Sequence, residues 1–132
     1  MLRIRSICPA DSEVWERLRC ELWPDGREDH AREIAAFFAG TLQEPEAVLV
    51  AENSESQVIA FAELLIRTDL PMLKGQPVGY VEGMYVVPEA RGLGVARALL
   101  QASRDWARAQ NCTAFASDRA HRVIVDKHFR EM

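Results

Sequence analysis

The stretch that decides the fold reads Gly79-Tyr80-Val81-Glu82-Gly83-Met84-Tyr85-Val86-Val87-Pro88-Glu89-Ala90-Arg91-Gly92-Leu93-Gly94-Val95-Ala96-Arg97-Ala98-Leu99-Leu100. Its first part is rich in β-branched and aromatic residues, which predicts a buried strand. Pro88 ends this strand, because proline has no N–H to donate to a neighbouring strand. A turn with two glycines follows. An Ala-, Leu- and Arg-rich segment then predicts a helix from near Leu93 to about Gln110.

The glycine turn has the properties of an anion-binding site. Gly92 and Gly94 have no Cβ, so a ligand can approach the main chain closely there. The helix leaves the N–H groups of its first turn unpaired, and the positive end of its dipole lies at the same place. We therefore expect the main-chain amides between Arg91 and Arg97 to bind a pyrophosphate or another polyanion. The alternative is a glycine-rich turn without a ligand.

Two common nucleotide-binding patterns do not fit this turn. A Walker loop requires Gly-Lys-Ser/Thr, whereas Gly94 is followed by Val95 and Ala96. A dinucleotide fingerprint requires a third glycine, whereas the third position here is Arg97.

The composition is that of a soluble globular protein. The chain has 132 residues, the size of one domain, with 48% hydrophobic and 27% charged residues. A net charge of −4 argues against a nucleic-acid partner and agrees with a cationic small-molecule substrate. No apolar run is long enough to cross a bilayer. The N-terminus does not read as a signal peptide.

The cysteines indicate a reducing compartment. Cys8, Cys20 and Cys112 are an odd number, and they show neither paired nor metal-ligand spacing. We therefore expect a cytoplasmic protein. We expect Cys112, in an apolar strand without an adjacent histidine, to be packed and inert rather than to carry an acetyl group. The scattered histidines suggest no metal set and are expected to be solvated or to cap helices; they are His30, His121 and His128.

The remaining elements follow from periodicity and breakers. Helices are predicted from Asp11 or Ser12 to about Trp23 and from Asp29 to Ala39. The other predicted strands are 2–6, 47–52, 57–67, 112–118 and 122–125, with a loop over 68–77. This order predicts one α+β domain over residues 1–132 with a mixed, mostly antiparallel sheet flanked by helices. The strands before and after the helix near Leu93 should be parallel.

The segment Arg91-Gly92-Leu93-Gly94-Val95-Ala96 resembles the Gln/Arg-x-x-Gly-x-Gly/Ala signature of GCN5-related N-acetyltransferases (GNAT). The resemblance implies that acetyl-CoA is the cosubstrate and that its pyrophosphate lies on the amides of this turn, up to Arg97. It also implies that the backbone of the preceding strand, at Met84, Tyr85 and Val86, pairs with pantetheine and polarises the thioester carbonyl.

Three further segments look like landmarks of aminoglycoside 6′-N-acetyltransferases: residues 18–24, 81–86 and 116–118. The similarity extends from Leu2 to Asp118. It implies that Trp23, Glu82 and Asp118 line the acceptor pocket. Carboxylates can accept a proton from the attacking amine and can attract a polycationic acceptor. We therefore expect Glu82 and Asp118 to be catalytic as well as substrate-binding.

Each of these three residues also has a purely structural interpretation. Glu82 could be an exposed carboxylate paired with an arginine such as Arg67. Asp118 could cap a helix or form a turn. Trp23 could be a core residue that closes the first helix rather than a residue of the pocket rim.

The chain departs from the family pattern after Asp118. The segment 122–125 resembles the family's last strand and follows almost at once, so the last helix and one strand of the fold are expected to be missing. Residues 119–132 then form an atypical tail. Asp126 stands where an aromatic residue is expected, and Leu70 replaces a loop tyrosine. Because a shortened sheet exposes an apolar edge, a homodimer is expected.

The sequence therefore predicts an N-acetyltransferase that moves the acetyl group of acetyl-CoA to a primary amine, the 6′-amine of an aminoglycoside. Its partners would be a small cationic amine and a second copy of itself, without nucleic acid or membrane. One alternative is an acetyltransferase for another amine, such as a polyamine or a protein N-terminus. The other is a degenerate, non-catalytic acyl-CoA-binding module.

Overall fold

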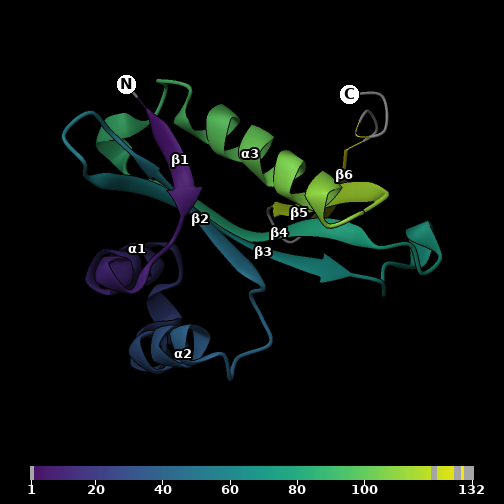
Figure 1. Cartoon of the computed structure of the whole chain (residues 1–132), viewed down its shortest axis with the longest axis horizontal. Helices are drawn as coiled ribbons and strands as arrows, with labels where there is room; N and C mark the ends of the chain where they lie inside the picture. The colour runs from purple at the N-terminus through teal and green to yellow at the C-terminus, as the bar shows by residue number, and fades with distance from the viewer. Residues whose placement is uncertain (1, 120–121, 127–128, 130–132) are drawn as a thin grey trace.

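A computed structural model describes residues 2–119, 122–126 and 129 (Figure 1). Its strands form one sheet in the order β1-β2-β3-β4-β5-β6, antiparallel throughout except for the parallel pair β4 and β5. The elements are β1 Arg3–Ser6, α1 Ser12–Leu22, α2 Arg27–Ala39, β2 Ala47–Glu52, β3 Val58–Arg67, β4 Val78–Val86, α3 Val95–Ala109, β5 Ala114–Arg119 and β6 Arg122–Val125. The predicted α+β class and the parallel pair are confirmed.

The helices cover the two faces of the sheet. Helix α3 lies on one face, and α1 and α2 lie together on the other (Figure 1). Side chains of β3 contribute to the hydrophobic clusters on both faces of the sheet, because successive side chains of a strand point to opposite faces. Ala60 and Ala62 pack in the cluster of α3 with Leu99, whereas Phe61 packs with Trp15 from α1. The nearly continuous apolar run of β3 therefore reflects a sheet buried on both faces.

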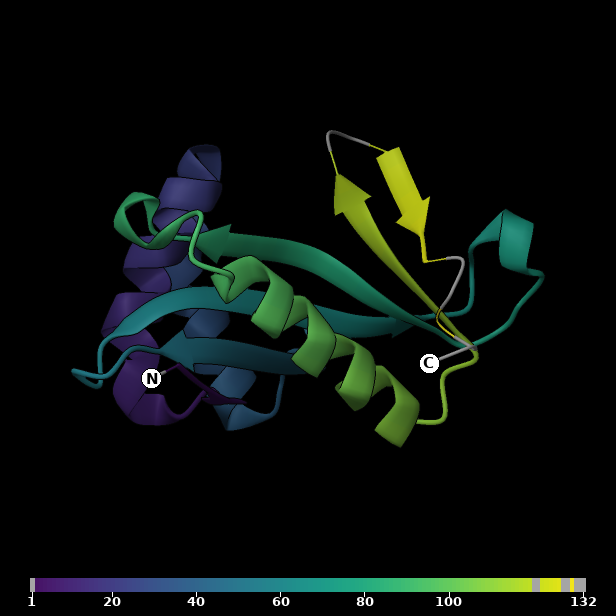
Figure 2. The ribbon, with the colours of Figure 1, turned by 90° about the horizontal axis from the view of Figure 1, so that it is seen from above.

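A β-bulge interrupts the pairing of β3 with β4. Glu63 pairs with Gly83, but its neighbour Leu64 pairs with Val81, so Glu82 is the extra residue on β4. The pairing of β4 with β5 has its last partners at Val81 and Ser117, immediately before the bulge. Bulges bend a strand and increase its twist. Figure 2 shows that β5 diverges from β4 beyond this point, so the sheet opens at its centre.

Strand β6 pairs antiparallel with β5, from Arg119 opposite Arg122 to Ala116 opposite Val125. Only residues 120–121 separate the two strands, so the connection has no room for the helix of the family pattern. The bounds of β6 match the predicted strand 122–125. Helix α3 begins at Val95 rather than near Leu93, because Gly94 adopts a left-handed conformation with φ of 84° and ends the turn.

Candidate active site

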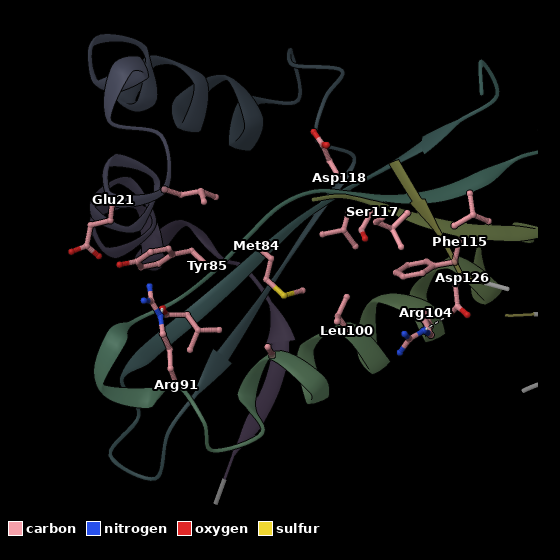
Figure 3. A pocket seen from close by; sticks show the side chains of 16 residues that line it. Glu21, Met84, Tyr85, Arg91, Leu100, Arg104, Phe115, Ser117, Asp118 and Asp126 are labelled. Carbon is pink, nitrogen blue, oxygen red and sulfur yellow. Dashed lines mark hydrogen bonds and ion pairs between the residues drawn. The ribbon is translucent and has the colours of Figure 1, made fainter. Parts of the chain in front are cut away.

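A pocket of about 960 Å³ lies where β4 and β5 diverge (Figure 3). Strand β4 forms one wall and β5 the other, with α3 below. The lining residues are Glu21, Leu22, Val81, Met84, Tyr85, Val86, Arg91, Ala96, Leu100, Arg104, Phe115, Ser117, Asp118, Ile124, Val125 and Asp126. Because the walls are largely apolar and the rim is charged, the pocket suits a long ligand with a polar end.

Strand β4 presents backbone groups to this opening. The Val87 N–H donates to the Ile59 carbonyl oxygen at 2.9 Å, so this pair faces β3. Because backbone groups alternate along an antiparallel strand, those of Met84 and Val86 face the opposite side, where β5 has diverged. The Val86 carbonyl oxygen accepts a hydrogen bond from Arg91 Nε at 2.9 Å. The free edge of β4 thus offers main-chain donors and acceptors to an extended ligand.

The glycine turn is open at the start of α3. Gly92 and Gly94 have φ of 81° and 84°, and a Cβ built on either residue would meet no atom within 4 Å. The Ala98 N–H donates to the Gly94 carbonyl oxygen at 3.1 Å. The amides of Val95, Ala96 and Arg97 precede this bond in the helix, so they have no helical carbonyl to pair with. The Val95 side chain is buried in the core beneath them.

A second, smaller pocket of about 250 Å³ lies on the opposite face of the sheet and is strongly acidic. Its lining residues are Glu44, Leu65, Arg67, Asp69, Tyr80, Glu82 and Asp118. Asp118 also lines the large pocket, so the two pockets meet at this residue. The structure therefore brings Glu82 and Asp118 together, beside the point where β4 leaves β5. Asp118 lies within β5 and neither caps a helix nor lies in a turn.

The surroundings of Glu82 favour its protonated form. Burial raises the pKa of the Glu82 carboxyl above its ordinary value, and the nearby Glu44 carboxylate raises it further, against the opposing charges of Arg19 and Arg67. Arg67 does not form the ion pair with Glu82 that the structural alternative required. Its guanidinium binds Asp69 instead, with Nε 2.9 Å from Oδ1 and Nη2 2.9 Å from Oδ2. A carboxylate so placed is suited to exchange protons.

Trp23 is half-buried and is not among the residues that line either pocket. Its indole rests on Gly83, where an added Cβ would overlap the ring, and it meets the Phe61 ring edge-on at 6.4 Å between centroids. The Trp23 carbonyl lies 3.0 Å from Nε2 of His30, which is buried rather than solvated and acts at the C-terminal cap of α1. Trp23 therefore packs against β4 as the structural interpretation requires, and it adjoins Glu82 only through Gly83.

A buried ion pair between Arg19 and Glu63 lies against the Trp23 ring. Arg19 Nε donates to Glu63 Oε2 at 2.8 Å, and Trp15 Nε1 donates to the same oxygen at 3.0 Å. The Arg19 guanidinium lies 5.2 Å from the Trp23 ring centroid. Glu63 pairs in register with Gly83, so the network lies directly beneath the bulge. The sequence analysis missed it, although a lone carboxylate within the apolar run of β3 was a signal.

Other expectations are settled by burial and pairing. Leu70 is buried in the core near Tyr80. Asp126 accepts a hydrogen bond from Arg104 Nε at 2.7 Å in the wall of the large pocket. Cys112 is buried, and burial raises the pKa of its thiol, which agrees with inert packing. The expectations for His121 and His128 lie outside the described residues.

The sequence analysis also missed several residues of the acidic pocket. Tyr80 had a signal, since it lies two positions before Glu82 and so on the same face of β4. No sequence signal indicated Glu44 and Asp69, because they lie in loops and not in the periodic pattern of a strand. Within the described ranges, no group of His, Cys, Asp and Glu side chains is arranged to hold a metal ion. None of the helices in that part of the chain has the length and apolar character required to cross a membrane.

Known proteins with the same architecture carry out acetyl transfer. The chain is 45% identical over 116 residues to the aminoglycoside N(6′)-acetyltransferase type 1 of Klebsiella aerogenes, covering 87% of this chain and 76% of that protein. The crystal structure of an aminoglycoside antibiotic 6′-N-acetyltransferase from Acinetobacter baumannii superposes with a TM-score of 0.78 at 34% identity, covering 91% of this chain and 80% of that one.

A third comparison includes a ligand that joins both substrates. The aminoglycoside acetyltransferase AAC(6′)-Iy, solved with the bisubstrate analogue CoA-S-monomethyl-acetylneamine, superposes with a TM-score of 0.79 at 29% identity, covering 91% of this chain and 80% of that one. The sequence profile of the acetyltransferase (GNAT) family matches residues 12–128, which is most of the chain. This match, the similarity to these relatives and the opening between β4 and β5 agree with one another. The protein therefore belongs to the GNAT acetyltransferase family.

Proposed function

We propose that this protein transfers the acetyl group of acetyl-CoA to a primary amine of an aminoglycoside, at the 6′ position. One observation carries the proposal: a long apolar pocket and a small acidic pocket meet at Asp118, next to Glu82. The first suits an acyl carrier and the second a polycation. The relatives named above, all aminoglycoside acetyltransferases, support the same pair of substrates.

Acetyl-CoA would lie along the edge of β4 and over the start of α3. The unpaired amides of the glycine turn would hold the pyrophosphate, and the backbone of β4 would pair with pantetheine. The residues proposed to hold acetyl-CoA are Met84, Tyr85, Val86, Arg91, Gly92, Leu93, Gly94, Val95, Ala96 and Arg97. The backbone groups of Met84 and Val86 would pair with pantetheine, whereas Tyr85, whose backbone faces β3, would contribute its side chain to the pocket wall. Arg91 would act partly by holding the end of β4, since its guanidinium already binds the Val86 carbonyl.

Glu82 and Asp118 would prepare the acceptor. The ammonium group of the acceptor must lose a proton before it can attack, and Glu82 would accept that proton, directly or through water. The neutral amine then attacks the thioester carbonyl, and a main-chain N–H of β4 stabilises the oxyanion. The C–S bond breaks and CoA leaves as the thiolate, which takes up a proton. Trp23 would form the side of the acceptor site.

The test combines binding and turnover. We expect calorimetry to show binding of acetyl-CoA and then of kanamycin or tobramycin, and mass spectrometry to show a single added acetyl group. Glu82→Gln should lower kcat by about 10²- to 10⁴-fold with the fold intact, the range for loss of a general base. Glu28→Gln, on the exposed face of α2, is the matched control. Binding of acetyl-CoA without the antibiotic would indicate another amine as acceptor or a non-catalytic acyl-CoA-binding module, and turnover with a polyamine or a peptide N-terminus would separate these two.

The pH profile gives a second test of the role of Glu82. A base works only when ionised, so the rate should fall as pH falls through the pKa of Glu82. Because burial raises that pKa, the fall should begin at a higher pH than for an ordinary glutamate. Glu82→Gln should abolish this limb of the profile, and a limb that persists in the variant would assign it to another group.

We also infer that the protein acts in the cytoplasm as a homodimer. The three cysteines are free thiols in the structure, which suits a reducing compartment. Strand β6 pairs with β5 along one edge, and it carries Ile124 with 44% of its surface exposed. A second copy covering this edge would bury that side chain. Elution as a monomer in size exclusion with light scattering would contradict the dimer.

A further inference from the structure

The acidic pocket contains one cation of its own. Four carboxylates line it, from Glu44, Asp69, Glu82 and Asp118, and the guanidinium of Arg67 lies among them. Arg67 comes from the end of β3, where it pairs in register with Val78. Because a pocket for a polycation gains affinity from negative charge, a fixed positive charge in its wall opposes binding. The charge of Arg67 should therefore influence which acceptors the pocket binds.

Arg67 is held in place on two sides. Its guanidinium makes the two-pronged hydrogen bond to the Asp69 carboxylate at 2.9 Å for each pair of atoms, the geometry preferred by arginine and carboxylate. Its planar group also lies over the Tyr80 ring, 4.6 Å from the centroid. The Arg67 side chain is only 29% exposed. The positive charge is thus a fixed part of the wall rather than a mobile surface group.

The pairing divides the carboxylates into two sets. Asp69 and Arg67 form an ion pair without net charge, whereas Glu82 and Asp118 line the pocket without such a partner among the described residues, and Asp118 also lines the large pocket. An ammonium group near Asp118 meets uncompensated carboxylates, but one placed toward the end of β3 meets this neutral pair. Charge alone would therefore direct one amine of the acceptor to Glu82, and Arg67 removes the attraction that Asp69 would offer to further amines.

We propose that Arg67 is a specificity-determining residue that limits the positive charge an acceptor carries into the acidic pocket and directs its reactive amine toward Glu82. This inference rests on the proposed function of the pocket. It predicts that acceptors are ranked by the number and position of their ammonium groups, and that the ranking changes when the charge of Arg67 is removed while its packing is kept.

The experiment uses Arg67→Met, which retains a flexible stem over Tyr80 but removes the charge. Acceptors are kanamycin A and kanamycin B, which differ only in whether one position carries a hydroxyl or an amino group. At low salt, KM and the calorimetric Kd for kanamycin B should fall by about three- to tenfold, the effect of one unit charge at partly screened distances. Those for kanamycin A should fall less, and the difference should shrink at high salt.

Two controls separate charge from structure. Arg67→Lys keeps the charge and should retain the wild-type ratio between the two acceptors. Arg32→Met removes an arginine that is paired with Asp29 on exposed α2 and should change neither constant. An unchanged ratio in Arg67→Met, or a rise in KM for both acceptors, would overturn the inference, since a rise would mean that Arg67 binds the acceptor directly.

Calorimetry without turnover distinguishes the two proposals. If the wild-type protein binds the kanamycins but acetylates neither, the proposed function fails, while a changed binding ratio in Arg67→Met still supports the role of Arg67. If neither the wild-type protein nor Arg67→Met binds either compound, the inference fails as well. Thermal melting of each variant establishes that the compared proteins are folded.

Discussion

A methyl group added at Gly83 should impair the reaction with the acceptor while leaving the binding of acetyl-CoA nearly unchanged. A Cβ built on Gly83 would overlap the Trp23 indole, with Cη2 only 2.5 Å away, and would lie 3.2 Å from Leu22 Cδ2. Ordinary contact between carbon atoms requires about 3.5 Å, so Gly83→Ala must move the indole by roughly 1 Å. The ring cannot retreat freely, because Phe61 and the Arg19 guanidinium pack against it.

The displacement should be visible in the kinetics of the acceptor. A shift of about 1 Å in a substrate-positioning group can cost up to about 10²-fold. We expect Gly83→Ala to lower kcat/KM for kanamycin by about ten- to a hundredfold and to lower the free energy of unfolding by about 1–3 kcal/mol through overpacking. The calorimetric Kd for acetyl-CoA should stay within about twofold, because the methyl group points to the face of the sheet that carries α1 and α2.

The control is the same substitution on the other face of the same strand. A Cβ at Gly79 would overlap the Cβ of Ala107 on α3, far from Trp23. Gly79→Ala should therefore lower the free energy of unfolding by a similar amount while leaving the KM for kanamycin close to the wild-type value. If the two variants affect the acceptor equally, or if Gly83→Ala leaves it unaffected, the proposed role of Trp23 is refuted.

Two further predictions concern stability. Glu63→Ala leaves the buried Arg19 charge with only the partly exposed Glu33 as partner and should lower the free energy of unfolding in urea by about 3 kcal/mol, the lower end of the range for a broken buried pair, whereas Arg19→Met combined with Glu63→Leu should recover most of the loss. Hydrogen bonds from Arg5 lower the pKa of Asp11 to about 2, so its carboxylate stabilises the fold above about pH 4, and this contribution, about 2 kcal/mol, is lost as pH falls toward 2. Asp11→Asn should remove that pH dependence; an unchanged acid limb would assign it to other carboxylates.

The order of elements could be predicted because each depends on residues close together in the chain. The short apolar run of residues 47–52 identified β2 with the bounds found in the structure, and Gly40 at the end of α2 adopts the left-handed conformation expected of a helix C-cap. The glycine turn before α3 was likewise visible, since Gly92 and Gly94 both have positive φ. These features follow from local backbone sterics and from the periodicity of apolar residues.

The pairing of charges could not be predicted in the same way. Arg67 and Glu82 both line the acidic pocket, and the sequence left their pairing open; the structure pairs Arg67 with Asp69, which lies two residues further along the chain. The buried pair of Arg19 with Glu63 joins residues 44 positions apart. Such contacts depend on which face of the sheet each helix covers, and that is settled by packing rather than by local pattern.

The sequence by itself therefore determined the strand, the glycine turn and the helix, and with them the resemblance to the family and the expected place of an anion site. Only the tertiary structure decided how Glu82, Asp118 and Trp23 are arranged. The physical reason is the bulge at Glu82, because one extra residue on β4 places Glu82 and Gly83 on the same face, seats Trp23 on the glycine and separates β4 from β5. A strict alternation along β4 would not have revealed that insertion.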